Sequence, residues 1–220
     1  KYKLFYKLNK LVFSRASMKK NTKFIFQNKK DKDIFLKRGF SSKEKSIVIN
    51  GSGIDASKFQ FYQRKASRSV SFLFSSRLVK AKGIREYLDA GKKIKNIFPE
   101  TKINIAGKYD PSDSDSISKE LFLEIQNSSD CDYLGEIRHD DMENCYKQSD
   151  IFVLPSYGEG LPKAALEAAA SGMPLILSNA SGCLECINDN ETNGLIISSR
   201  CTESLKTAME SIINSEEKIS

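Results

Sequence analysis

The sequence predicts an α/β fold, with a doubly wound, Rossmann-like parallel sheet over residues 68–220. From about residue 70 onward, short apolar runs alternate with segments of helical periodicity. The runs contain few polar residues, as expected for strands that helices cover on both faces. Repeated units of strand and helix build a doubly wound sheet, in which ligands bind beyond the carboxyl ends of the strands.

Each strand of this sheet is predicted from an apolar run that stops at a turn residue. Gly107 closes the second run, Gly135 the third and Pro155 the fourth. Glycine and proline interrupt regular structure, so they mark where strands give way to loops. The predicted strands span residues 70–75, 103–106, 131–134, 151–154, 175–177 and 195–197.

Apolar residues at helical spacing predict the connections between these strands. They form a stripe over residues 84–97, which Pro99 ends. Pro162 suits the first turn of a helix over residues 163–171, and Gly172 suits the position just past its end. Further helices are predicted at residues 117–125, 140–149, 182–187 and 202–213, with a polar turn at residues 111–115.

Residues 1–65 follow a different pattern. A basic amphipathic helix is predicted over residues 1–13, strands at 24–26 and 47–49, and a helix at 31–38. We interpret residues 1–50 as the C-terminal remnant of a preceding domain and residues 51–67 as a connector to the domain of residues 68–220. Because the chain begins with Lys1 rather than Met, we expect a fragment or a processed product. Residues 1–13 do not have the uninterrupted apolar core of a signal peptide.

The net charge of +7 is unevenly distributed. Residues 1–45 hold 15 Lys and Arg against 3 Asp and Glu, whereas the remainder is mildly acidic. This asymmetry indicates either a solvated basic face or contact with an anionic membrane surface. Nucleic acid is disfavoured, because the aromatic residues among the lysines fit a helical apolar face better than a base-stacking surface. No stretch approaches the ~20 apolar residues that a membrane span needs.

The cysteine pattern argues against a metal site. Five cysteines without a secretory signal indicate reduced thiols in the cytoplasm. Cys183 and Cys186 form a C-x-x-C pair, but a structural zinc site needs four ligands and His139 is distant in sequence. We therefore expect no metal and, at this pair, two small half-buried residues on a short helix. His139 is expected at the surface.

A glycine-bearing loop between the fourth strand and the next helix is the strongest local signal. It contains Glu159, Gly160 and Leu161, and Glu167 follows on the helix. A helix N-terminus exposes backbone N–H groups that bind phosphate, and a loop carboxylate accepts hydrogen bonds from sugar hydroxyls. In the alternative interpretation, Glu159 complements the helix dipole and Glu167 is a solvated helix residue.

Two cations follow the first strand of the sheet. Arg77 and Lys82 lie in the loop of residues 76–83, where a planar guanidinium and a point charge suit a diphosphate. A basic surface loop is the alternative. The parallel sheet favours the first interpretation, since it places this loop and the Glu159 loop at the same edge.

Taken in order, these motifs resemble the retaining glycosyltransferases of family 4, which have the two-domain GT-B fold. The resemblance covers about residues 22–215. It rests on residues 50–55 with Phe59, on residues 76–78 with Lys82 and Gly83, on residues 149–156 leading into Glu159 and Glu167, and on residues 181–185 with 193–195. It implies that residues 68–220 are the C-terminal domain of a GT-B fold and that residues 1–50 belong to the acceptor domain.

The resemblance also implies roles for individual residues. Arg77 and Lys82 would bind the donor diphosphate, Glu159 the donor sugar near its anomeric carbon, and Glu167 the nucleotide ribose. Backbone groups of Gly160 and Leu161 would add phosphate contacts, and the segment from Gly135 to Ile137 would line the base pocket. The family usually needs no metal, and UDP is the nucleotide that the resemblance favours.

A hexosyltransferase of bacterial surface-polysaccharide type, cytoplasmic or peripheral on the membrane, is therefore the expected function. The acceptor would be a saccharide, in particular a polyprenyl-linked oligosaccharide. Because the family carries its acceptor site in the N-terminal domain, we expect residues 1–220 alone to bind nucleotide weakly and not to turn over.

Two alternatives remain open at this point. A nucleotide-sugar epimerase or a phosphorylase shares the cleft, and product analysis would separate either from a transferase. A non-catalytic nucleotide-binding module is the other alternative; the set of Arg77, Lys82, Glu159 and Glu167 argues against degeneration but not against truncation.

Overall fold

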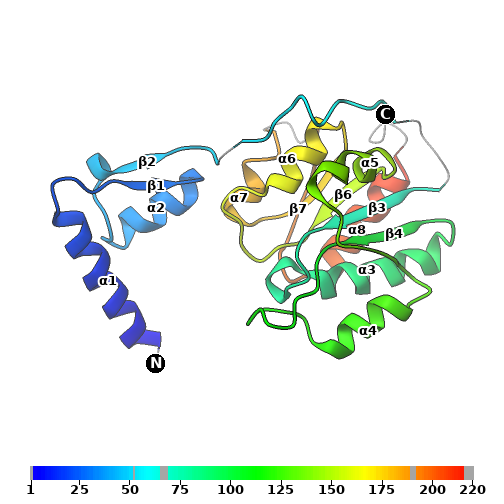
Figure 1. The fold of residues 1–220 in the computed structure, drawn as a ribbon, viewed down its shortest axis with the longest axis horizontal. Coiled ribbons are helices and arrows are strands. Elements are labelled where there is room, and N and C mark those ends of the chain that lie inside the picture. Colours follow the sequence, from blue (N-terminus) through cyan, green and yellow to red (C-terminus); the bar gives the residue numbers. More distant parts are fainter. Residues whose placement is uncertain (1, 52, 65–68, 189–191, 216–220) are drawn as a thin grey trace. The chain divides into compact units, whose positions relative to one another are not determined.

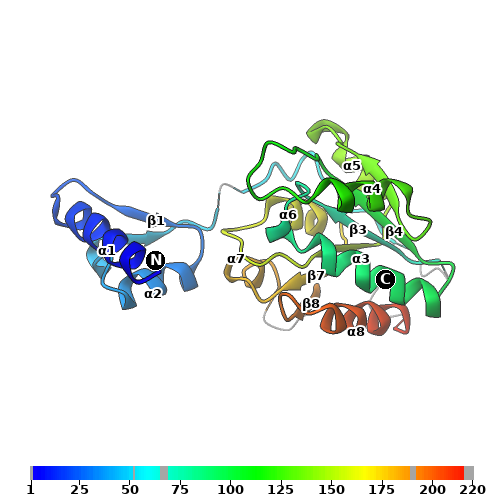
Figure 2. The ribbon, with the colours of Figure 1, turned by 90° about the horizontal axis from the view of Figure 1, so that it is seen from below.

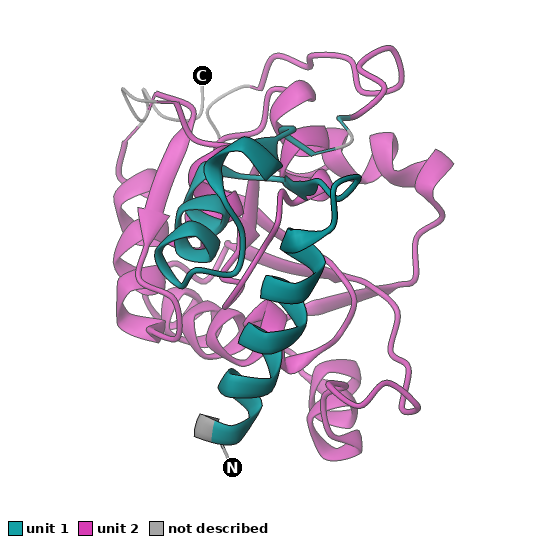
Figure 3. Cartoon of the chain, turned by 90° about the vertical axis from the view of Figure 1, so that its left-hand side faces the viewer, with its two compact units in different colours: residues 1–53 teal, residues 54–220 magenta. Residues whose placement is uncertain are grey.

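The computed structural model describes residues 2–51, 53–64, 69–188 and 192–215. The chain divides into two compact units, Lys1–Gly53 and Ile54–Ser220, which Figure 3 shows in different colours. Ser52 and residues 65–67, which belong to the predicted connector, lie outside the described residues.

A parallel sheet forms the centre of the second unit (Figure 1). Within the described residues its order is β5-β4-β3-β6-β7-β8. The strands are β3 (Ser71–Ser75), β4 (Lys102–Ala106), β5 (Asp132–Gly135), β6 (Ile151–Leu154), β7 (Leu175–Ser178) and β8 (Gly194–Ile197). The chain builds outward from β3 to β5, then returns to β6 on the other side of β3. The doubly wound α/β fold is therefore confirmed, with its switch point between β3 and β6.

Helices cover both faces of this sheet (Figures 1 and 2). On one face, α3 (Ile84–Ile97) and α8 (Thr202–Ile213) lie side by side, next to α4 (Lys119–Asn127). On the other face lie α5 (Met142–Lys147) and α6 (Lys163–Ala170), and α7 (Ser181–Leu184) follows β7. Right-handed crossovers require this division, because the chain reverses its direction of travel across the sheet after β5.

The core lies between the sheet and these helices. All residues of β3, β6 and β7 are buried, which explains why these strands are apolar apart from serines at the ends of β3 and β7. Tyr87 of α3 is also fully buried, and its hydroxyl donates to the carbonyl oxygens of Phe72 and Asn104. Buried polar groups need such partners, so this tyrosine fixes α3 on the sheet.

The segment of residues 54–64 packs onto the second unit through two buried side chains. Phe59 joins the core, and the Arg64 guanidinium donates to the carbonyl oxygens of Tyr146, Ser149 and Ser171 at 2.7–3.0 Å. Burial lowers the pKa of Arg64, but an arginine stays charged, so the cost of burial is offset by these charge-assisted hydrogen bonds. The segment is thus anchored where α5 and α6 end.

The first unit holds α1 (Tyr2–Met18), β1 (Phe24–Phe26), α2 (Lys29–Lys37) and β2 (Ser46–Val48). The two strands pair in parallel, and a cluster of aromatic rings around Phe35 packs between them and the helices. Asn28 caps α2, its side chain accepting from the Asp31 N–H. None of the helices in the described part of the chain combines the length and apolar character that a bilayer crossing requires.

Several helices differ from their predicted bounds, three of them by the most. The helix predicted at residues 182–187 is α7, which ends at Leu184, so Cys186 lies beyond it. α1 continues to Met18, beyond the predicted end at residue 13, because residues 14–18 include no glycine or proline that would stop it. The helix predicted at residues 140–149 is shorter, since His139–Asp141 forms a 3₁₀ turn before α5 begins at Met142. Tight turns of this kind are common at helix N-termini.

Candidate donor-binding site

The loops that follow β3 and β6 meet at the switch point of the sheet. Because β3 and β6 are parallel neighbours, both loops leave at the same edge. The Tyr157 N–H donates to the Ala81 carbonyl oxygen at 2.8 Å, and the Ser156 hydroxyl donates to the same oxygen at 3.1 Å. A Cβ at Gly83 would overlap the Pro155 carbonyl oxygen, and Gly83 has a φ of +74°. Glycine is therefore required where the two loops touch.

Lys82 and Glu159 form an ion pair between these loops. Lys82 Nζ lies 2.5 Å from Glu159 Oε1, and the two side chains are 19% and 9% exposed. These residues are 77 positions apart in the sequence, and the packing of the two loops brings them together. The ammonium of a partly shielded lysine can donate to a phosphate oxygen, and the carboxylate beside it can accept from a hydroxyl.

Arg77 has a different partner. Its guanidinium lies 2.8 Å from Asp113 Oδ2, in the polar turn that follows β4, and its side chain is 68% exposed. This turn also lies at the edge where the strands end, so Asp113 is available to Arg77 there. An exposed pair of this kind contributes little to stability, and an incoming anion can therefore compete for the guanidinium.

Gly160 and Leu161 lie between this ion pair and α6. The Gly182 N–H of α7 donates to the Glu159 carbonyl oxygen at 3.1 Å, and a Cβ at Gly182 would overlap the Gly160 carbonyl. α7 thus packs directly against the backbone of the loop that contains Glu159 and Gly160. Pro162 then leads into α6 at Lys163, so the N–H groups of the first turn of α6 follow directly after the loop.

Tyr157 adds a support that the sequence did not indicate. Its hydroxyl donates to Glu86 Oε1 at 2.6 Å, and the Arg200 guanidinium lies 4.5 Å from its ring centroid. Burial and then the Glu86 carboxylate raise the pKa of Tyr157 to about 12, so the hydroxyl stays a donor. Arg200 has a φ of 60°, an uncommon conformation for a residue with a side chain. Segments far apart in sequence thus fix the loop that presents Glu159.

Glu167 is buried on α6, with a side chain only 7% exposed. The interpretation of Glu167 as a solvated helix residue is therefore wrong. The Tyr146 hydroxyl donates to Glu167 Oε2 at 3.0 Å, and burial, then the carboxylate, raise the pKa of Tyr146 so that it stays protonated. His139 Nδ1 lies 3.8 Å from Glu167 Oε1. His139 is at the surface, as predicted, but it also faces a residue of the predicted site.

Gly135 and Ile137, which we predicted to line a base pocket, follow β5. Gly135 ends the strand with a φ of +76°, and its carbonyl oxygen accepts from the Gly107 N–H at 2.8 Å. Ile137 is half-buried and packs against the core. The segment leaves at the same edge as the Lys82 loop, because β4 and β5 are parallel to β3.

The cysteine pair has no sign of metal ligation. Cys183 and Cys186 are more deeply buried than predicted, and burial raises the pKa of each thiol to about 12. Metal binding requires thiolates, which this environment disfavours. Over residues 2–51, 53–64, 69–188 and 192–215, no group of three or more His, Cys, Asp or Glu side chains could hold a metal ion.

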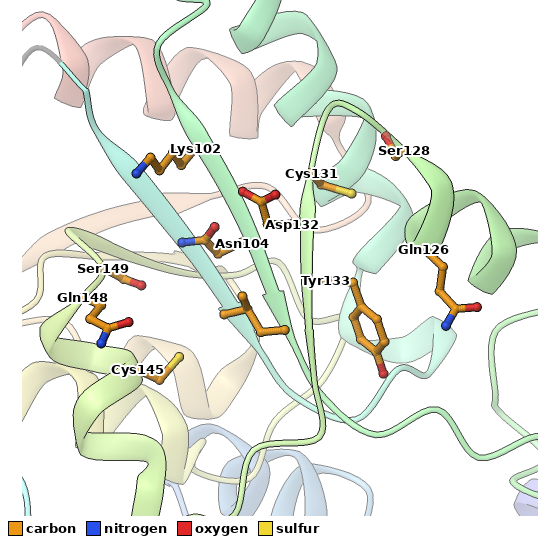
Figure 4. Close-up of a pocket in the computed structure, with 11 residues that line it drawn as sticks. Lys102, Asn104, Gln126, Ser128, Cys131, Asp132, Tyr133, Cys145, Gln148 and Ser149 are labelled. Carbon is orange, nitrogen blue, oxygen red and sulfur yellow. The ribbon is translucent and has the colours of Figure 1, made fainter.

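A hollow of about 800 Å³ lies elsewhere, over β4 and β5 (Figure 4). Lys102 and Asp132, which begin these strands, line it together with Asn104, Cys145 and Gln148. Gln148 and Ser149, which precede β6, line it as well, so several of its lining residues lie at or just before the amino ends of strands. The loops described above follow the carboxyl ends, so this hollow is separate from the candidate site.

A family model described as "Glycosyl transferases group 1" matches residues 55–219. The chain belongs to this family. Its relatives include the UDP-Gal:alpha-D-GlcNAc-diphosphoundecaprenol alpha-1,3-galactosyltransferase of Escherichia coli, with 31% identity over 215 residues. That match covers 89% of this chain and 51% of the relative, so the chain spans about half the length of the relative.

Solved structures show the same fold. The C-terminal domain of a glycosyl transferase group 1 family protein, LpcC from Francisella tularensis, matches with a TM-score of 0.64 and 22% identity. It covers 76% of this chain and 92% of that domain. Anabaena Alr3699/HepE in complex with UDP and glucose matches with a TM-score of 0.78 and 19% identity, over 97% of this chain and 59% of the other. The second unit is thus the C-terminal domain of a GT-B fold.

Proposed function

We propose that this chain is the donor-binding part of a glycosyltransferase that transfers a hexose from a nucleotide sugar, with UDP as the nucleotide and with retention of configuration. The observation that supports this most directly is the Lys82–Glu159 pair at the switch point of the sheet. Ligands of doubly wound folds bind at this point, and the pair offers one group for a phosphate and one for a sugar.

In this proposal Lys82 and Arg77 bind the diphosphate of the donor. Both cations lie in the loop after β3, and each is paired with a carboxylate in the unliganded protein. Gly160 and Leu161 contribute backbone contacts at the start of α6. Transfer leaves negative charge on the departing diphosphate, which two cations and a helix N-terminus stabilise without a metal ion.

Glu159 contacts the donor sugar, and Glu167 contacts the ribose. Glu159 is ion-paired through one oxygen, Oε1, and Tyr146 holds Glu167 through Oε2. Each carboxylate thus keeps a second oxygen for a hydroxyl of the ligand. The segment from Gly135 to Ile137, at the same edge, contacts the base.

The acceptor in this proposal is a polyprenyl-linked oligosaccharide; the name of the Escherichia coli relative gives a polyprenyl-linked sugar, GlcNAc-diphosphoundecaprenol, for that enzyme. A peripheral contact with the cytoplasmic membrane surface fits this acceptor. α1 contains no acidic residue, and it exposes Leu4, Phe5, Leu8 and Val12 on one face. Basic helices with an exposed apolar face bind anionic lipid surfaces.

Calorimetric titration of residues 1–220 with UDP, GDP and ADP tests the donor assignment. We expect UDP to bind most tightly and the variant Lys82→Ala to lose most of that affinity. Lys206→Ala, on α8, is a matched control because it breaks a partly buried ion pair away from the loops. Equal affinity of wild type and Lys82→Ala would remove the site.

Turnover tests the second half of the proposal. With UDP-sugars and an undecaprenyl-linked acceptor, residues 1–220 alone should bind donor without forming a glycosidic bond. A chain extended to the length of the relatives should form one, and proton NMR of the product should show the anomeric configuration of the donor. Efficient transfer by residues 1–220, or an inverted product, would contradict the proposal.

A further inference from the structure

His139 and Glu167 face each other across a gap that no protein group fills with a hydrogen bond. Their nearest polar atoms, Nδ1 and Oε1, are 3.8 Å apart, which is too long for a hydrogen bond. The other carboxylate oxygen accepts from the Tyr146 hydroxyl at 3.0 Å. Oε1 therefore retains capacity to accept a proton from a ligand.

The imidazole is held in place although it is accessible. His139 has a side chain that is 60% exposed, and its ring meets the buried Phe59 ring edge-on with centroids 5.7 Å apart. Phe59 also meets the Tyr146 ring, at 5.9 Å. One aromatic ring thus positions both the histidine and the tyrosine that orients Glu167.

The charged residues Lys58 and Asp140 pair with each other and not with His139 or Glu167. Lys58 and Asp140 flank Phe59 and His139 in the sequence, and they pair with each other at 3.3 Å on the surface. Glu167 is thus a nearly buried carboxylate whose described partners are a neutral hydroxyl and a histidine. Burial of a carboxylate is costly unless its oxygens are hydrogen-bonded, so a donor entering the gap would be favoured.

The width of the gap suits a hydroxyl group. An oxygen atom can lie about 2.8 Å from Nδ1 and from Oε1 at once, since the two atoms are 3.8 Å apart. Such a hydroxyl would donate to Oε1 and accept from the Nδ1–H. A carbonyl or phosphate oxygen could accept from the histidine but would be repelled by the carboxylate. The arrangement therefore selects for a group that is both donor and acceptor.

We propose that His139 and Glu167 together bind one ribose hydroxyl of the nucleotide, and that Tyr146 is a positioning residue that orients Glu167. This assignment rests on the proposed function, which places the ribose at Glu167, and it makes His139 a specificity residue for ribonucleotides. His139 distinguishes a ribose from a deoxyribose because, without the hydroxyl, the ligand offers no hydrogen bond to Nδ1 or Oε1.

Titrations with UDP, 2′-deoxy-UDP and 3′-deoxy-UDP test this assignment on residues 1–220. One deoxy analogue should bind wild type more weakly than UDP, by roughly fivefold to tenfold, the range for one hydrogen bond. His139→Ala should lose the same factor for UDP and nothing for that analogue. His139→Asn should recover part of the loss, since its amide N–H reaches a position close to Nδ1. Lys58→Ala, a neighbouring surface change, is the control.

Tyr146→Phe separates positioning from stability. The phenyl ring keeps its place beside Phe59, but Glu167 loses its hydrogen bond. The preference for UDP over the deoxy analogue should shrink, whereas a purely structural role would lower the melting temperature and leave that preference unchanged.

The outcomes distinguish this inference from the proposed function. If His139→Ala weakens UDP and both analogues equally, or weakens none, the histidine does not read the ribose. In that case Lys82→Ala would still lose most of the affinity for UDP, and the donor site would stand. If wild type binds no UDP, the proposed function fails and the inference fails with it.

Discussion

The ion pair between Lys82 and Glu159 leads to a prediction of unexpected sign. In the unliganded protein this lysine is already neutralised by a carboxylate, at 2.5 Å. A diphosphate that binds the same ammonium must tolerate that carboxylate nearby. We therefore expect Glu159→Gln to strengthen the binding of UDP, although the proposed function places Glu159 in the site.

The magnitude follows from the geometry. If a phosphate oxygen lies about 2.8 Å from Lys82 Nζ, the two anionic oxygens are roughly 4.5 Å apart. Two unit charges at that distance repel by about 1 kcal/mol in water and by about 4 kcal/mol at an effective dielectric constant near 20. Because the side chains are only 19% and 9% exposed, screening is incomplete. The Kd for UDP should fall by about fivefold or more.

Calorimetry with UDP and with a UDP-sugar measures how Glu159→Gln changes the affinity for the diphosphate and the affinity for the sugar. The extra affinity of the UDP-sugar over UDP should shrink in Glu159→Gln, because the carboxylate that we propose to accept from the sugar is lost. Glu210→Gln is the matched control, since it breaks an ion pair with side chains 23% and 26% exposed on α8. If Glu159→Gln weakens UDP binding while the control does not, Lys82 is not shared in the way that this reasoning requires.

Three further predictions concern other parts of the second unit. Arg77→Ala should weaken UDP binding by about 1.5 to 3 kcal/mol, the scale of a charge-assisted hydrogen bond, and unchanged affinity in calorimetry would remove Arg77 from the site. Arg64→Met should lower the free energy of unfolding by roughly 2 to 4 kcal/mol, measured by urea titration, because it leaves buried carbonyl groups without a donor; a smaller loss would mean that water replaces the guanidinium. At pH 8 the half-exposed thiol of Cys201 should react first with a disulfide reagent, whereas Cys183 and Cys186, with pKa values raised to about 12, should react only on unfolding; the same shifts predict that stability falls as the pH rises above about 8.5, where the unfolded thiols alone ionise.

The candidate site shows which functional residues a local sequence pattern can predict. Arg77, Lys82, Glu159 and Glu167 were selected from their places after strands, and the parallel order of β3 and β6 then places the first three at one edge. Their partners could not be selected in this way. Asp113 pairs with Arg77, and Tyr146 with Glu167, through contacts between segments that are 36 and 21 residues apart.

His139 also shows that a local sequence pattern does not predict contacts with distant residues. His139 is expected at the surface, and its side chain is indeed 60% exposed. Nothing in the sequence around it indicates that the next helix but one brings a buried carboxylate to it. Tyr157 and Arg200 are a second example, because their ring contact joins the loops after β6 and β8.

The sequence by itself determined the class of the fold, the order of strands and helices, and the loops in which chemistry is to be sought. It did so because apolar periodicity, proline and glycine act over a few neighbouring residues. The tertiary structure decided which charges are paired, which carboxylate is buried, and that His139 lies beside Glu167. Burial and pairing depend on residues brought together by packing, and a short stretch of sequence does not indicate which distant residues will pack against it.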